Sequence, residues 1–171
     1  MKKEIILILT LIFFGCQNEK KDNSLIVRYK NMSLEKVLSI SEKPGLFKLI
    51  TNTRNGFVAE SLMDGKRISV GLHNNVSLLS EIAIYTLTEE IPLKQVLKTI
   101  KEKENSLPTK ISHKGKKDDL EAFFFDVLPD YDEDRVYVSD IKKVIRWYNI
   151  LQSNEMLYLL DDHDEKSEEE E

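Results

Sequence analysis

Two turn dipeptides constrain this chain more strongly than any other feature of its sequence. Asn55-Gly56 and Asp64-Gly65 lie within the stretch 45–70, and each supplies the positive backbone φ angles that tight type I′ hairpin turns require. Apolar or β-branched residues flank both turns: Leu46, Phe47, Leu49, Ile50 and Thr51 before the first, Phe57, Val58 and Leu62 between them, and Ile68 and Val70 after the second. The stretch therefore predicts three short antiparallel strands.

The flanking segments extend this β unit. Ser33 is a good N-cap, and Leu34 and Val37 recur at helical spacing, which predicts a short helix before the strands. Residues 82–87 are β-branched and aromatic and predict a fourth strand. Four or five short strands with tight turns are typical of a small SH3-like or Tudor-like antiparallel β barrel, although an open sheet under a helix gives the same pattern.

Three amphipathic helices are predicted after the strands. The first begins at 89–92, because two carboxylates and Pro92 suit a first helical turn, and the second begins at 118–119. Ser139 is the predicted cap of the third, and Trp147 on that helix is expected to pack against the barrel. Each helix carries an apolar stripe: Leu93, Val96, Leu97 and Ile100; Leu120, Phe123, Phe124, Val127 and Leu128; and Ile141, Val144, Ile145, Tyr148 and Leu151.

The predicted fold class is therefore α+β: a small SH3-like or Tudor-like antiparallel β barrel, then a three-helix unit and a disordered acidic tail. The expected divisions are 1–32 (a leader or a stretch upstream of the true start), 33–90 (the barrel), 91–153 (the helices) and 154–171 (the tail). Charge follows this division, since 33–117 carries a net charge of +5 and 118–171 one of −13. The last part is too acidic and too poor in apolar residues to form a core of its own.

The first thirty-two residues admit two interpretations. A basic start, an apolar run from Ile5 to Phe14 and the pair Gly15-Cys16 follow the order of a secretory signal, and they resemble the lipobox in which the cysteine sulfur is lipidated. The run is too short to span a bilayer, which takes about 20 residues. In the other interpretation translation starts at Met32, directly before the first predicted helix. Lipidation of Cys16 would anchor the protein in the cell envelope, whereas a start at Met32 predicts a cytoplasmic protein.

No catalytic or metal-binding constellation stands out. Residues 130–134 place acids at positions 1, 3 and 5 of a calcium loop, but Arg135 stands where glycine is required and Ile141 where a bidentate glutamate is required. The three histidines lie far apart in the sequence, and no nucleophile elbow, Walker loop or Rossmann glycine pattern is present. We therefore expect a protein without enzymatic activity, metal or cofactor.

Basic residues gather at the two predicted turns and in the linker 105–117. The candidate binding residues are Arg54, Lys66, Arg67, Lys114, Lys116 and Lys117. On a small barrel such charges suit a nucleic-acid backbone. The aromatic platform on which bases stack is thin, however, because Phe47, Phe57 and Tyr85 are predicted to lie in the core. A solvated basic surface is the plainer alternative.

Several segments together resemble a known family. They are Ser39-Ile40-Ser41-x-Lys43-Pro44-Gly45-Leu46-Phe47-Lys48-Leu49, Glu60-Ser61-Leu62-x-Asp64-Gly65-Lys66-Arg67, Ile82-Ala83-Ile84-Tyr85-Thr86, Leu128-Pro129-x-Tyr131-Asp132-x-Asp134-Arg135-Val136-Tyr137, and Ile141-Lys142-Lys143 through Trp147-Tyr148-Asn149. Over about 33–152 the chain resembles a family of small bacterial proteins known only as a domain of unknown function. The resemblance implies a two-part architecture, offers no catalytic or ligand residues, and implies a start close to Met32.

The expected function is a non-enzymatic interaction module that binds or assembles with a protein partner. The alternative is binding of nucleic acid or a ribonucleoprotein through the basic hairpin turns and the linker 105–117. Contact with a membrane is expected only through a lipidated Cys16, if that N-terminus is translated.

Overall fold

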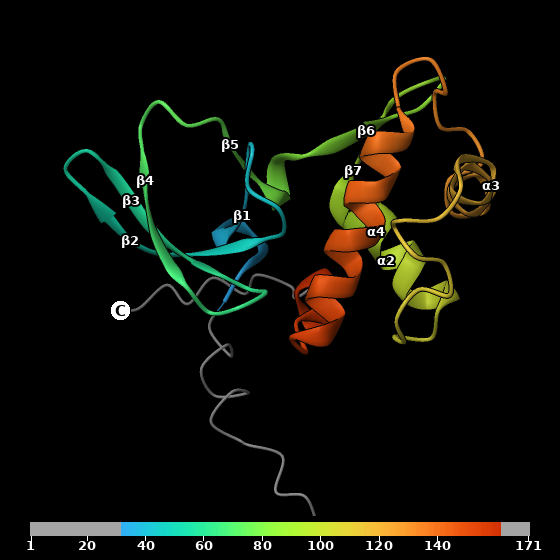
Figure 1. Cartoon of the computed structure of the whole chain (residues 1–171). Coiled ribbons are helices and arrows are strands. Elements are labelled where there is room, and N and C mark those ends of the chain that lie inside the picture. The colour runs from blue at the N-terminus through green and yellow to red at the C-terminus, as the bar shows by residue number, and fades with distance from the viewer. Residues whose placement is uncertain (1–31, 162–171) are drawn as a thin grey trace, which may run out of the picture.

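The computed structural model describes residues 32–161, with a curled sheet on one side and the helices on the other (Figure 1). In chain order the elements are η1 (Leu34–Lys36), β1 (Val37–Ile40), β2 (Phe47–Thr53), β3 (Gly56–Ser61), β4 (Arg67–Gly71), β5 (Val76–Leu78), η2 (Leu79–Glu81), β6 (Ala83–Tyr85), β7 (Glu90–Pro92), α2 (Leu93–Lys103), α3 (Lys117–Val127), α4 (Val138–Ser153) and η3 (Leu157–Leu160). The predicted α+β class with three helices is confirmed. The N-terminal segment with Cys16, and the tail beyond residue 161, lie outside the described residues.

The main sheet is antiparallel and has the strand order β4-β3-β2-β1-β5. Within residues 32–161, β4 and β5 have one neighbouring strand each, so the sheet has two free edges. The predicted closure into a barrel is therefore wrong. The strand predicted at 82–87 does not join this sheet, because β6 pairs with β7 in a separate two-stranded sheet.

The turn between β6 and β7 explains why the predicted fourth strand does not join the main sheet and why the first helix begins later than predicted. The Thr86 hydroxyl donates to the carbonyl of Glu89 (2.7 Å) and accepts from its N–H (3.0 Å), which folds the chain back on itself. Residues 89–92, predicted as the start of a helix, are thereby used in the turn and in β7. The first helix begins only at Leu93, with Pro92 as its N-cap.

Neither predicted hairpin turn is a type I′ turn at its dipeptide, although the glycine of each dipeptide has a positive φ angle. Thr53 pairs with Gly56, so Arg54 and Asn55 form the first turn, and Gly56 (φ 147°) already belongs to β3. The second connection is five residues long, and only Gly65 in it has a positive φ (69°). The strands on either side lie close to where the alternating pattern predicts them.

Local signals also misplaced two helix starts. The segment predicted as a short helix after Ser33 is only a 3-10 turn, because Val37 and Leu38 continue into β1. The third helix begins at Val138 rather than after Ser139, and Asp140 accepts a hydrogen bond from the N–H of Tyr137 (3.3 Å). Asp140 therefore supplies the capping interaction from inside the helix.

Two apolar cores hold these elements. The main core joins the three helices to the sheet through Val37, Leu46, Leu62 and Leu79. The second lies in the curl of the sheet and contains Leu38, Ile40, Phe47, Ala59 and Val70, with partly buried apolar side chains around it. In β1 the alternation of side chains thus sends Val37 to one core and Leu38 to the other.

The segment 154–171, predicted as a disordered acidic tail, contributes its first part to the main core. Met156 and three of the four η3 residues are buried, because this short stretch is apolar before the acids begin. Lys101 of α2 forms an ion pair with Asp161 at the end of the described chain (2.5 Å). No helix within residues 32–161 is long and apolar enough to cross a bilayer.

The two hairpin glycines offer a matched test of this register. A Cβ on Gly56 would lie 2.0 Å from the carbonyl oxygen of Val70, whereas a Cβ on Gly65 would meet nothing within 4 Å. We expect Gly56→Ala to lower the free energy of unfolding by about 3 kcal/mol or more, because backbone atoms must move. Gly65→Ala should cost only about 1 kcal/mol, for its left-handed backbone.

Urea denaturation followed by circular dichroism measures both values. Equal losses in the two variants would contradict the observed pairing of Gly56 with Gly71.

Candidate functional site

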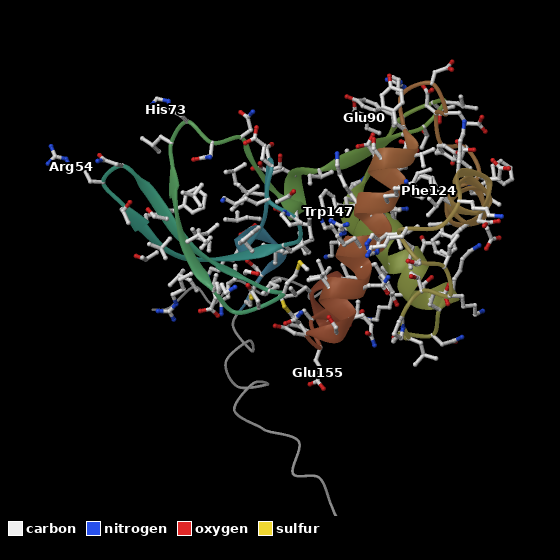
Figure 2. All side chains as sticks on the ribbon, in the orientation of Figure 1. Arg54, His73, Glu90, Phe124, Trp147 and Glu155 are labelled. Atoms are coloured by element: carbon white, nitrogen blue, oxygen red, sulfur yellow. The ribbon has the colours of Figure 1, made fainter. Side chains whose placement is uncertain are left out.

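Three connected hollows lie between the sheet and α4 and form one groove. The upper hollow (260 Å³), beside β6, and the middle one (540 Å³), under the β1–β2 loop, share Ser77, Ile82, Lys143 and Trp147. The lower hollow (390 Å³) reaches the linker and shares Pro44 and Arg146 with the middle one. We call these hollows together the α4 groove. Trp147 lines its upper and middle hollows, and Figure 2 shows this residue between α4 and the sheet.

The groove exists because α4 has two faces with different surroundings: one packs into the main core and the other lines the groove. Its apolar stripe enters the main core, while Lys143, Arg146, Trp147 and Ile150 recur at i, i+3, i+4 and i+7 on an adjacent face. The β1–β2 loop covers that second face without filling it. Trp147, whose burial was expected from the sequence, forms part of the groove and of the main core.

Positive charge dominates the lining. Five cationic side chains line the three hollows, against two carboxylates: Lys43, Lys114, Arg135, Lys143 and Arg146, against Glu42 and Asp140. Lys143 pairs with Asp140 (2.8 Å), and Arg135 pairs with Asp132 outside the groove (2.7 Å). The described residues offer the side chains of Lys43, Lys114 and Arg146 no ion-pair partner, so the groove keeps an excess of positive charge.

Arg135 fixes the upper wall of the groove. Its guanidinium donates to Asp132 (2.7 Å) and to the carbonyl of Thr86 (3.2 Å), and it lies 4.2 Å from the centre of the Tyr85 ring. The hydrogen bond from Arg135 holds the pKa of the Asp132 carboxyl below its usual value. The loop after α3 is thereby attached to β6, and the N–H of Asp132 also donates to the carbonyl of Tyr85 (3.0 Å).

The acidic run 130–134 thus acts as a structural loop. The Asp132 carboxylate accepts hydrogen bonds from the N–H of Asp134 (3.0 Å) and from the Arg135 side chain. Both of its oxygens therefore stabilise the fold of this loop. Among residues 32–161 no three His, Cys, Asp or Glu side chains are grouped so as to hold a metal ion.

The lower end of the groove is fixed by the linker. Asn149 accepts from the N–H of Thr109 (2.9 Å) and donates to its hydroxyl (2.7 Å), so residues on α4 hold the linker in place. His113 follows in this linker, and its pKa is lowered by burial and then by the nearby charges of Arg146, Lys114 and Lys142. The charge part of this shift, which is smaller than the part due to burial, comes from cations at this end of the groove.

The six predicted binding residues do not come together. Arg54 lies at the tip of the β2–β3 hairpin, far from α4 in Figure 2. Lys66 and Arg67 form ion pairs with Asp64 and Glu60 (3.0 Å each), and Lys117 pairs with Glu121 (3.5 Å). Lys116 is exposed at the start of α3, so only Lys114 lines the α4 groove.

The ion pair at the second turn is local. The Asp64 carboxyl has its pKa lowered to about 2, chiefly by hydrogen bonds from Ser61 and Lys66. Since Lys66 is largely exposed, its charge is screened by solvent as well as paired.

The sequence did not predict Lys143, Arg146 and Trp147 as groove residues, and their helical spacing was the only signal available for them.

Comparisons with known proteins give a family and no activity. Residues 34–79 match the family model described as Domain of unknown function (DUF5606), and residues 82–151 match Domain of unknown function (DUF6852). A solution NMR structure from Bacteroides vulgatus, a Northeast Structural Genomics Consortium target, has 42% sequence identity and a TM-score of 0.63, and the match covers 78% of this chain and 99% of that one. Comparison with the curated proteins finds no match.

The potential at the lower end of the groove can be measured through His113. Protonated His113 is repelled by Arg146, so we expect Arg146→Gln to raise the pKa of His113 toward its usual value of 6.5. Because the folded pKa lies below the unfolded value, wild-type stability falls as the pH drops below 6.5, and the variant should lose less of it.

An NMR titration of the His113 ring protons measures this shift, with Lys36→Gln on η1 as the control. If the pKa of His113 were the same in both variants, Arg146 would not contribute to the potential there.

Proposed function

The chain belongs to the bacterial family whose two parts are the domains of unknown function DUF5606 and DUF6852, and from that premise we propose that it is a non-enzymatic interaction module. Its α4 groove binds an acidic segment of a protein partner. The observation that carries the proposal is the excess of cations in a preformed groove, three of them without an ion-pair partner among residues 32–161.

The geometry suits binding better than chemistry. The cations of the groove are lysines and arginines, which attract anions and position them, and the two lining carboxylates are not paired with a nucleophile. Tight attachment of both walls, by Arg135 above and by Asn149 below, keeps the groove open before a ligand arrives. A preformed site loses less conformational entropy when the ligand binds.

Binding of nucleic acid or a ribonucleoprotein, through the hairpin turns and the linker 105–117, is the second candidate. Arg54 and Lys116 favour it, because both are exposed and the described residues give their side chains no ion-pair partner. The pairing of Lys66, Arg67 and Lys117 with neighbouring carboxylates weighs against it. We therefore place the protein partner first.

Two finer assignments complete the proposal. We assign the sheet to the SH3-like or Tudor-like type, in an open form. The pairing of β1 with both β2 and β5 supports this assignment. The last residues of the chain serve as an acidic, solvating tail, which their composition supports. The two cellular locations, cytoplasmic or anchored through Cys16, stay predictions.

Poly-L-glutamate is a simple probe of the groove, and Trp147, the only tryptophan of the chain, reports its binding by fluorescence. We expect the double variant Lys143→Gln with Arg146→Gln to weaken binding about tenfold, since two exposed charge contacts of roughly 0.7 kcal/mol each are lost. The matched control, Lys66→Gln with Arg67→Gln, removes the same charge at the second turn and should bind as the wild type does.

The affinity should also fall with added salt. Equal weakening in both double variants, or no binding of the polymer by the wild type, would overturn the assignment of the groove. Stronger binding of a single-stranded oligonucleotide, lost in the turn variant alone, would support the second candidate instead.

A further inference from the structure

The two ends of the α4 groove differ in chemistry. The upper hollow is lined by the apolar side chains of Ile82, Ile84, Val144 and Trp147, and its two cations, Arg135 and Lys143, are already paired with Asp132 and Asp140. The lower hollow has Pro44, Met63 and Ile150 beside Lys114 and Arg146, two cations to which the described residues give no ion-pair partner. A ligand that satisfies both ends needs an apolar group and an anionic group. We propose that this ligand is an extended acidic peptide with one apolar side chain, which enters the upper hollow while carboxylates lie against Arg146; the inference rests on the proposed function.

The spacing along α4 sets the register of such a peptide. The residues of α4 that line the upper hollow are centred near Val144, and those that line the lower one are centred near Asn149. At a rise of 1.5 Å per residue, the two centres lie about 7 Å apart along the helix. An extended chain covers that distance in about two residues, so the first carboxylate follows the apolar residue by two positions.

Charge complementarity defines the rest of the ligand. The middle hollow, between the two ends, adds Lys43 and Lys143 against one carboxylate, Glu42, so positive charge predominates from the middle of the groove to its lower end. Lys143 already has Asp140 as its partner, and Lys43 and Arg146 have no such partner among the described residues. The peptide carboxylates therefore complete ion pairs that the fold leaves open.

The aromatic residues of the groove favour a peptide over nucleic acid. Binding of a base needs an exposed aromatic face, but only 8% of Trp147 is accessible, and Arg135 covers one face of Tyr85. The upper hollow, with a volume of 260 Å³, instead suits a single aliphatic or aromatic side chain.

Short synthetic peptides test the proposal. We expect acetyl-Leu-Gly-Glu-Glu-Glu-amide to bind about tenfold more tightly than acetyl-Gly-Gly-Glu-Glu-Glu-amide, because burial of the leucine side chain adds apolar contact. The fluorescence of Trp147 measures both dissociation constants. The pKa of His113, measured by NMR, should rise on binding of either peptide, since carboxylates then lie near its ring.

A variant that fills the upper hollow separates the two ends. Ala83 is exposed on β6 and lines this hollow, so Ala83→Leu should abolish the preference for the leucine peptide, measured as the ratio of the two dissociation constants. Ser69→Leu, at an exposed position of β4 outside the groove, is the matched control and should keep the preference.

The outcomes distinguish this inference from the function on which it rests. If both peptides bind equally, or if the preference survives in Ala83→Leu, the apolar anchor is wrong and the acidic-segment groove stands. If neither peptide nor poly-L-glutamate binds, both are wrong. Tighter binding of a five-nucleotide single strand at Trp147 would overturn the peptide ligand.

Discussion

The contact between one end of the curled sheet and the three helices is the constraint on which the other features depend. One core contains Val37, Leu46 and Leu62 from the sheet and its loops together with Leu97 and Tyr148 from the helices. Burial of each such side chain contributes roughly 1.5–3 kcal/mol, so the two parts stabilise each other through a few residues. Either part alone would expose this apolar surface to water.

The groove is a by-product of that same contact. The sheet meets the helices at one end through the main core, while its own curl is filled by a second core. Because α4 packs its apolar stripe into the main core, the neighbouring face with Lys143 and Arg146 is left beside the β1–β2 loop. The hydrogen bonds of Arg135 and Asn149 then hold the walls of the groove in place.

Local patterns predicted the strands around Gly65 and the three helices, because alternation and helical spacing are properties of neighbouring residues. These patterns failed where the structure of a segment depends on a partner that is distant in the sequence. Residues 82–85 have strand character, but their pairing with β7 depends on the turn that the Thr86 hydroxyl closes. The groove was not predicted either, since Arg146 and Pro44, about a hundred residues apart in the sequence, line the same two hollows. Only Lys114 of the predicted binding residues lines it, because clustering in sequence at a turn does not bring charges to a common surface.

Within residues 32–161 the outer edge of β4 has no neighbouring strand, and this has a consequence for how the protein behaves at high concentration. An edge strand presents unpaired N–H and C=O groups, and a second molecule can add to them and start aggregation. Lys66 and Arg67 stand at the beginning of this edge as exposed, ion-paired side chains, Lys66 with Asp64 and Arg67 with Glu60. A strand that adds to the open sheet at this point must displace water from charged side chains, which disfavours the addition.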